Sequence, residues 1–369
     1  MPLALIGSVL ISLVVSFFAT GLARRLGDRL AAHDGQGVAG QVKAEIRRIP
    51  NTGGIGIVVT LLVVLVPATI AAVLWKAPES DADMLANLAS GVRENLTLLG
   101  SFLAGLVVLH GMGVIDDRRP LGWKPKLFVM LIVPAAVAWT SQTRILWLLD
   151  PYVGGPWLSV LVTMFWFVVV MNAMNFLDNM DGLAGGLGAV IAAGLLAVAL
   201  LNGQWIIAFG AGTLLGATLG FLPHNFPKAR VFMGDGGSLA IGYTIAFLTV
   251  RLNYAEMETG GSQWHLLFVP LVLLAIPLYD FASVVLIRLS QGKSPFVGDL
   301  QHFSHRMARR GLGRTGAVVA IWILAAITGA GAVVMSRSTP WQASLIAAQT
   351  LAVLGLIAYL ERGVPERQS

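Results

Sequence analysis

The chain has 369 residues, of which 56% are apolar and 12% charged, and its mean hydropathy is +0.77. A soluble domain is about a quarter charged, so this composition excludes an ordinary soluble fold. The formal net charge of +6 falls on short segments between apolar runs, which predicts membrane orientation signals and no nucleic-acid partner. The chain contains no cysteine, which excludes disulfides and thiol catalysis.

Apolar runs of about 20 residues, long enough to cross roughly 30 Å of hydrocarbon, recur along the chain and predict an all-α membrane bundle. We expect eleven transmembrane helices, near residues 2–23, 53–75, 96–115, 127–141, 156–175, 183–201, 205–222, 237–250, 266–288, 316–335 and 341–360. The first run is too long for a signal-peptide core and has no basic residue before it, so we expect an uncleaved helix. Residues 1–369 are therefore expected to form a single integral membrane domain.

The basic residues predict the orientation of this bundle. Of the 25 Lys and Arg residues, 20 fall on one alternating set of loops: Arg24, Arg25, Arg29, Lys43, Arg47, Arg48, Arg118, Arg119, Lys124, Lys126, Lys228, Arg230, Arg288, Lys293, Arg306, Arg309, Arg310, Arg314, Arg362 and Arg367. The positive-inside rule makes this side cytoplasmic, with the N-terminus outside and the C-terminus inside. We expect a multi-pass protein of the cell (inner) membrane.

Five acidic residues lie at the cytoplasmic ends of the predicted spans. Asp116 and Asp117 end the third span, Asp178 and Asp181 follow the fifth, and Asp235 precedes the eighth. Carboxylates are costly within a membrane, so acids from three distant segments that meet on one side predict a functional site. The alternative is that these interfacial acids are merely solvated.

The first acidic motif, residues 113–126, joins adjacent carboxylates to basic residues. Asp116 and Asp117 are followed within ten residues by four Lys or Arg residues. Carboxylate oxygens suit Mg²⁺, and Lys or Arg suits phosphoryl oxygens, so the motif favours a phosphate and metal site.

The second motif, residues 172–184, is more specific. Asn172, Asn175, Asp178 and Asp181 are spaced by three residues, which on a helix places them roughly along one face. Such a face suits a polar ligand better than lipid. The alternative is a polar seam that joins neighbouring helices through amide hydrogen bonds.

A third motif surrounds Asp235 with glycines in residues 231–238. Glycine lets the backbone approach a ligand closely, and the following helix N-terminus offers free N–H groups to a phosphate.

The fourth motif lies in a long basic loop between the ninth and tenth spans. His302, His305 and Arg306 are candidates to contact a phosphate or a sugar. Two histidines three residues apart also suit zinc, but no third or fourth ligand is near them in the sequence.

Together these motifs resemble the polyprenyl-phosphate N-acetylhexosamine-1-phosphate transferase family over nearly the whole chain. The resemblance rests on residues 48–54, Asp116 and Asp117 with Lys126, residues 172–184, Asn225 with residues 231–238, residues 277–280 with Arg288, and residues 294–302. It implies a helical membrane bundle, often a homodimer, that uses Mg²⁺, with Mn²⁺ as an alternative. The implied substrates are a UDP-sugar and a polyprenyl phosphate lipid, and the products are a polyprenyl diphosphate-sugar and UMP.

The resemblance also implies roles for individual residues. Asp116, Asp117, Asp178 and Asp181 resemble catalytic positions, and Asp235 with Asp117 the metal ligands. The implied substrate-binding residues are Arg47, Arg48, Lys126, Asn172, Asn175, Asn225, His302, His305 and Arg306. Ser304 stands where many members have a further histidine, which puts any role of that histidine in doubt.

Within the family, the chain resembles the branch that uses UDP-GlcNAc to start O-antigen, teichoic acid or other surface glycans. It lacks the three adjacent histidines of the phospho-MurNAc-pentapeptide translocases, which are the main alternative. A non-enzymatic transporter would place its ionisable residues near the midplane, where only Asp280 lies clearly inside a predicted span. A CDP-alcohol phosphotransferase would need arginine where Gly185 stands, and a structural scaffold would not need five clustered acids.

Overall fold

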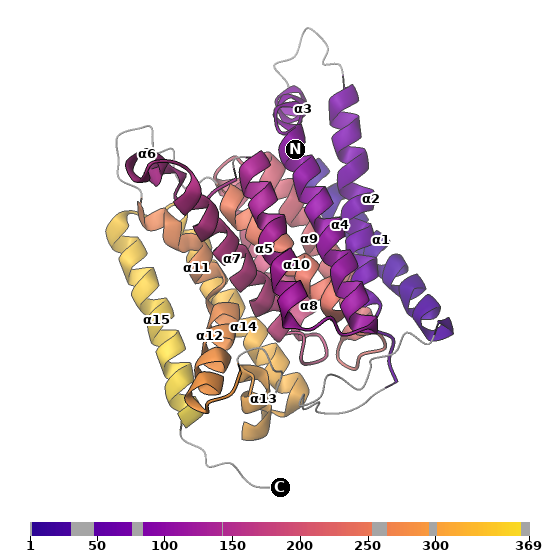
Figure 1. Ribbon diagram of the computed structural model, residues 1–369, viewed down its shortest axis with the longest axis vertical. Helices are drawn as coiled ribbons and strands as arrows, with labels where there is room; N and C mark the ends of the chain where they lie inside the picture. The colour runs from indigo at the N-terminus through magenta and orange to yellow at the C-terminus, as the bar shows by residue number, and fades with distance from the viewer. Residues whose placement is uncertain are drawn as a thin grey trace.

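The computed structural model describes residues 2–30, 48–75, 84–141, 143–252, 264–294 and 301–362, and in these ranges the regular structure is helical. Figure 1 shows one bundle of long helices that run roughly alongside one another. Its helices are α1 (Pro2–Arg29), α2 (Gly53–Leu74), α3 (Met84–Glu94), α4 (Leu96–Arg118), α5 (Trp123–Thr140), α6 (Asp150–Val153), α7 (Trp157–Phe176), α8 (Leu183–Leu201), α9 (Trp205–Asn225), α10 (Gly234–Arg251), α11 (Val269–Leu273), α12 (Ala275–Ser290), α13 (Phe303–Met307), α14 (Gly313–Met335) and α15 (Pro340–Arg362). The prediction of an all-α bundle is therefore confirmed.

Within the described residues, eight helices are long and apolar enough to cross a membrane, or nine if the bent pair α11 and α12 is one span. This confirms a multi-pass membrane protein but not the predicted count of eleven spans. The two remaining predicted spans form α5 and α10, helices of 18 residues each. Almost every residue of α10 is buried by neighbouring helices, so its Gly, Ser and Thr residues need not face lipid and its hydropathy is correspondingly low.

The centre of the bundle is α10, which packs against α4, α7 and α2 (Figure 1). Glycines permit the closest crossings. A Cβ atom added to Gly54 of α2 would overlap the backbone of Gly237, and one added to Gly113 of α4 would overlap the backbone of Gly236. Small residues of this kind let membrane helices approach backbone to backbone. The first turn of α10 is therefore fixed from two sides.

A bend of 72° separates α11 from α12. Pro277 in the first turn of α12 has no N–H to donate to the carbonyl of residue 273, so the helix cannot continue straight through this point. The bend places Asp280, on α12, inside the protein with its side chain fully buried.

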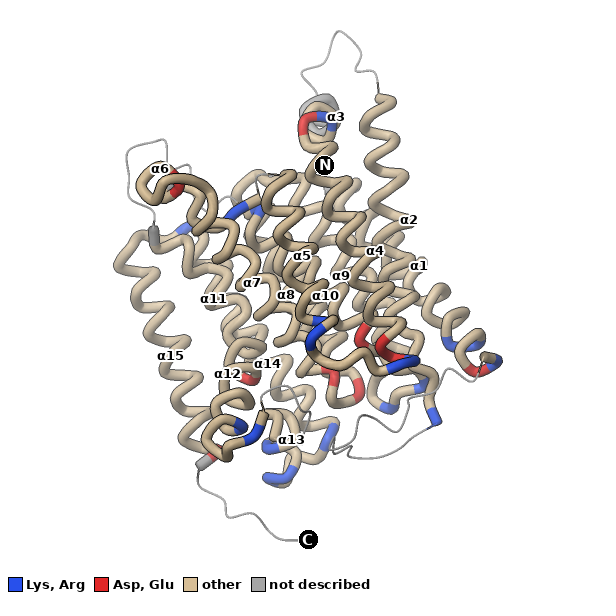
Figure 2. The backbone as a smooth tube through the Cα atoms, in the orientation of Figure 1, with Lys and Arg blue, Asp and Glu red and all other residues tan. Residues whose placement is uncertain are grey.

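Most of the charged residues that Figure 2 colours lie at one end of the bundle, with fewer at the opposite end near α3 and α6. Figure 2 shows the acidic residues of α4, α10 and the α7–α8 connection at the lower end, together with the basic ends of α1, α12 and α13. In Figure 1, α15 also ends at this lower end, whereas α1 begins nearer the upper end. This arrangement agrees with the predicted grouping of charges, and the side of the membrane on which they lie stays a prediction.

Candidate active site

The structure brings the predicted acids of three segments into one polar cluster. Lys126, in the first turn of α5, places its Nζ atom 2.9 Å from Asp116 Oδ2 and 2.5 Å from Asp235 Oδ2. Asn175, near the end of α7, donates from Nδ2 to Asp235 Oδ1 at 2.9 Å and to Ser238 Oγ at 2.9 Å. One ammonium group thus bridges carboxylates that are 119 residues apart in the chain.

Asp117 faces the start of α10. Its Oδ1 atom accepts the backbone N–H of Asp235 at 3.0 Å, and its Oδ2 atom accepts that of Gly236 at 3.3 Å. A carboxylate at this position satisfies free N–H groups and interacts favourably with the helix dipole. Asn51, in the segment before α2, donates to Asp117 Oδ1 at 2.9 Å, and its own Oδ1 atom is buried without a hydrogen-bond partner.

Asp178 lies in the connection between α7 and α8, beside the same cluster. Burial raises the pKa of this carboxyl well above its ordinary value, and the negative charges of Asp235 and Asp117 raise it further. The same charges favour a cation next to Asp178, because a cation would offset the repulsion between the carboxylates.

Two other predicted residues, Asp181 and Asn225, stabilise the loops around the cluster through hydrogen bonds to their backbone. Asp181 Oδ2 accepts the backbone N–H of Ala229 at 3.0 Å. Asn225 accepts the backbone N–H of Gly182 at 2.7 Å and donates to the carbonyl of Val231 at 2.8 Å. These bonds tie the α7–α8 connection to the segment between α9 and α10.

Two predicted residues are not joined to the cluster by hydrogen bonds that we observe, and one cannot be placed. Asn172 donates to the carbonyl of Val168 in its own helix at 2.7 Å. Arg48 is exposed in the segment before α2, and Arg47 lies outside the described residues.

The histidine segment, residues 302–306, packs against α12 and the α7–α8 connection. His302 Nδ1 lies 3.0 Å from Asp280 Oδ2, and the backbone N–H of Phe303 donates to Asp280 Oδ1 at 2.6 Å. Ser304 is fully buried, and its hydroxyl donates to Asn179 Oδ1 at 2.6 Å. Because Asn179 follows Asp178 in the chain, this bond joins the histidine segment to the connection between α7 and α8, which is called the acidic connection below.

The other two predicted residues of this segment differ in their contacts. The ring of His305 lies with its centroid 6.5 Å from that of His302. Arg306 donates to both carboxylate oxygens of Glu361 on α15, at 2.9 and 3.1 Å.

The cluster offers oxygen ligands of the kind that Mg²⁺ prefers. Asp235 and Asp117 present carboxylates, and the Oδ1 atom of Asn51 is a buried amide oxygen that lacks a hydrogen bond. Among the residues that the structure describes, no three His, Asp or Glu side chains are grouped so that they could hold a metal ion. The oxygen donors of Asp235, Asp117 and Asn51 nevertheless suit the ion chemically, and the ammonium of Lys126 supplies positive charge between Asp116 and Asp235.

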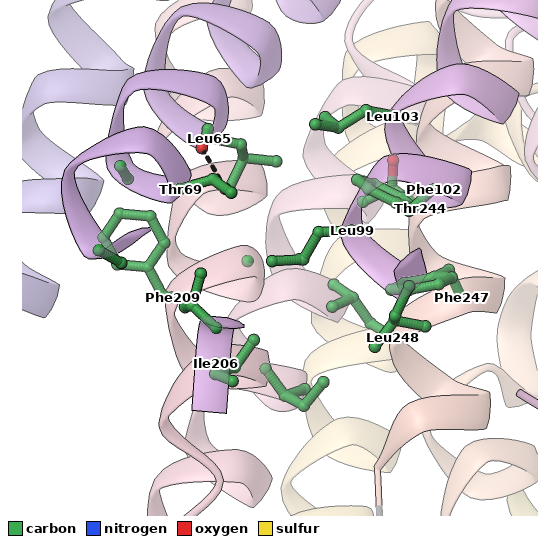
Figure 3. Close-up of a pocket in the computed structure, with 16 residues that line it drawn as sticks. Leu65, Thr69, Leu99, Phe102, Leu103, Ile206, Phe209, Thr244, Phe247 and Leu248 are labelled. Carbon is green, nitrogen blue, oxygen red and sulfur yellow. Dashed lines mark hydrogen bonds between the residues drawn. The ribbon is translucent and has the colours of Figure 1, made fainter. Parts of the chain in front are cut away.

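An apolar pocket with a cavity volume of about 100 Å³ lies elsewhere in the bundle, between α2, α4, α9 and α10 (Figure 3). Its two hydroxyl groups are already satisfied, because Thr69 and Thr244 donate to the carbonyls of Leu65 and Ala240 in their own helices. The pocket is lined by the first turns of α4, whereas Asp116 lies in the last turn, on the order of 20 Å further along the helix. It is therefore separate from the polar cluster.

The sequence predictions missed four residues that shape this site. Asn51 lies in the motif of residues 48–54 and Ser238 in that of residues 231–238. Polar residues are common in such glycine-rich segments, so neither residue type by itself indicated a role in the site. Asn179 lies between two predicted acids. Glu361 is 55 residues from its partner Arg306, and the sequence offers no pattern that links them.

Residues 99–253 match the sequence model of glycosyl transferase family 4. A decaprenyl-phosphate N-acetylglucosaminephosphotransferase of Mycobacterium tuberculosis (strain ATCC 25618 / H37Rv) is 30% identical over 98% of this chain and 90% of its own length. A probable undecaprenyl-phosphate N-acetylglucosaminyl 1-phosphate transferase of Bacillus subtilis (strain 168) is 28% identical over 76% of this chain and 77% of its own. An undecaprenyl-phosphate alpha-N-acetylglucosaminyl 1-phosphate transferase of Salmonella typhi is 30% identical over 62% of this chain and 63% of its own.

Proposed function

Because the chain belongs to glycosyl transferase family 4, we propose that it transfers N-acetylglucosamine 1-phosphate from UDP-GlcNAc to a polyprenyl phosphate. The products are polyprenyl diphosphate-GlcNAc and UMP, and the reaction starts a cell-surface glycan. The observation that carries the proposal is the bridge that Lys126 makes between Asp116 and Asp235. This bridge places an ammonium group between two carboxylates at the charged end of a membrane bundle.

The transfer reaction does not require a strong general base. An oxygen of the lipid phosphate attacks the β-phosphorus of UDP-GlcNAc and forms a new P–O bond, while the bond from that phosphorus to the bridging oxygen breaks and UMP leaves with the oxygen. A phosphate monoester has a second pKa near 6, so the acceptor is mostly a dianion at neutral pH. The main obstacle is repulsion between two anions, which positioning and positive charge overcome.

The residues of the polar cluster have different roles in this reaction. Lys126 contacts the phosphoryl oxygens, and Asn175 orients Asp235 through the hydrogen bond observed between them. Asp235 and Asp117 would hold Mg²⁺, or Mn²⁺ in its place, and the ion would neutralise charge on the diphosphate. Asp116 orients Lys126 through the hydrogen bond between them, and His302 and His305 would contact the sugar nucleotide when it is bound.

The same proposal predicts the membrane in which the protein lies and the side that the site faces. UDP-sugars are cytoplasmic metabolites, so on this proposal the charged end of the bundle faces the cytoplasm and the protein lies in the inner membrane. The family resemblance adds a homodimer to the proposal. The basic residues at that end agree with the positive-inside rule.

The test is an assay of UMP release by the purified protein with undecaprenyl phosphate, Mg²⁺ and a panel of UDP-sugars. We expect the highest kcat/KM with UDP-GlcNAc and no turnover with UDP-MurNAc-pentapeptide. Release of UMP from the pentapeptide substrate alone would assign the chain to the translocase branch, and no release from any UDP-sugar would refute the proposal.

A further inference from the structure

Most of the N–H donors of the Arg306 guanidinium group form hydrogen bonds within the protein. Nε and Nη2 donate to the two oxygens of Glu361, Nη2 also donates to Ser283 Oγ at 2.9 Å, and Nη1 donates to the carbonyl of Gln301. A guanidinium has five N–H donors, so these four bonds leave at most one for a ligand. Arg306 is therefore poorly suited to the direct substrate contact that its sequence position suggests.

Glu361 is the centre of this arrangement. It lies in the last turn of α15 and accepts a third hydrogen bond from the hydroxyl of Tyr279 on α12, at 2.6 Å. The side chains of Arg306 and Glu361 are each 13% exposed, and their bidentate pairing fixes direction as well as distance. Many apolar side chains of α15 are exposed, such as Leu351 and Tyr359, whereas Glu361 in its final turn makes polar contacts with the rest of the protein.

Three elements hold the short helix α13 from different sides. Asp280 of α12 accepts from the backbone N–H of Phe303, and Asn179 of the acidic connection accepts from Ser304. Glu361 of α15 holds the other end of the helix through Arg306. His305 lies between these attachments, so the direction of its ring depends on both.

We propose that Glu361 is a positioning residue that, through Arg306, fixes α13, and with it His305, against the connection between α7 and α8 that carries Asp178. This inference rests on the proposed function, because it gives His305 a task in the transfer reaction. It also reassigns Arg306 from a ligand of the substrate to a link between α15 and the site.

A double-mutant cycle tests the inference in the UMP assay with UDP-GlcNAc. Glu361→Ala and Arg306→Ala should each lower kcat about tenfold and change KM by less than about threefold, because a displaced group weakens transition-state contacts more than substrate binding. The double variant should be no slower than either single variant, since both remove the same link. Effects that multiply, or a Glu361→Ala variant with unchanged kcat, would overturn the proposal.

Milder variants keep the test valid if alanine impairs folding. Glu361→Gln is nearly isosteric and removes only the charge, so we expect about a threefold loss of kcat with an unchanged melting temperature. Ser344→Ala is the matched control on the same helix, because Ser344 donates only to the carbonyl of Pro340 within α15, and it should leave kcat unchanged. A loss in Ser344→Ala equal to that in Glu361→Gln would indicate a general effect of α15 and contradict a specific link.

Amide hydrogen exchange provides a readout that does not depend on activity. In Glu361→Ala, the amides of Phe303 and Arg306 should exchange at least tenfold faster than in the wild type, whereas in Ser344→Ala they should not. If the wild type releases no UMP, the proposed function fails while this measurement still tests the positioning of α13. Unchanged exchange in Glu361→Ala would overturn the positioning role.

Discussion

Replacement of Lys126 by methionine removes the cation that bridges two carboxylates while it keeps most of the side-chain volume. The ammonium makes hydrogen bonds to Asp116 and Asp235 at 2.9 and 2.5 Å. A hydrogen bond to a charged group contributes about 1.5 to 3 kcal/mol, so the two bonds together are worth about 3 to 6 kcal/mol. If Lys126 makes equivalent contacts with phosphoryl oxygens in the transition state, kcat/KM should fall by about 10² to 10⁴.

The assay is UMP release with UDP-GlcNAc and undecaprenyl phosphate, together with thermal unfolding in detergent. Lys124→Met is the matched control: it removes the same charge from the same turn of α5, but Lys124 is exposed and lies 5.7 Å from the ring centre of Trp123. We expect this variant to keep most of its activity. The reasoning is refuted if Lys126→Met retains more than about a tenth of wild-type kcat/KM, or if both variants lose activity equally.

Asp235→Asn should nearly abolish UMP release without lowering expression, because it removes a proposed ligand of the ion, and retention of more than about a tenth of the activity would argue against that role. His305→Ala should reduce turnover in the same assay, and wild-type kinetics would show that the histidine segment is structural. Gly54→Ala should lower both the melting temperature and activity, since the added methyl overlaps Gly237, and a stable, active variant would contradict the close crossing. Direct attack predicts that radiolabelled UMP does not exchange into UDP-GlcNAc in rigorously delipidated enzyme, whereas exchange near the turnover rate would indicate a covalent intermediate.

The convergence of the acids was predictable because each acid lies at the end of a long apolar run, and the alternation of spans assigns such ends to one side. The structure confirms this grouping for Asp116, Asp178 and Asp235. The number of spans was less predictable. A central helix such as α10 is covered by protein on all sides, so its hydropathy need not resemble that of a lipid-facing helix.

Specific side-chain pairs could not be predicted, because they depend on how each helix is rotated about its axis. Asn172 and Asn175 share a predicted face, yet only Asn175 bonds to Asp235, while Asn172 bonds within its own helix. Ser304 illustrates the same point. Many members of the resembled family have a histidine at this position, but in this protein the buried hydroxyl of Ser304 leaves little room for a ring, so we expect Ser304→His to impair the site.

The glycine crossings of α2, α4 and α10 bear on how such an enzyme can change its donor during evolution. Gly54, Gly113, Gly236 and Gly237 meet where a single added methyl group would push helices apart, so the start of α10, which carries Asp235, cannot be remodelled by stepwise substitution without loss of the bundle itself. The segment that carries His302 and His305 is attached through hydrogen bonds to the side chains of Asp280 and Asn179, and such side chains can be exchanged one at a time. We therefore expect sugar preference to diverge among relatives through the histidine segment, while the crossing of the three helices stays the same.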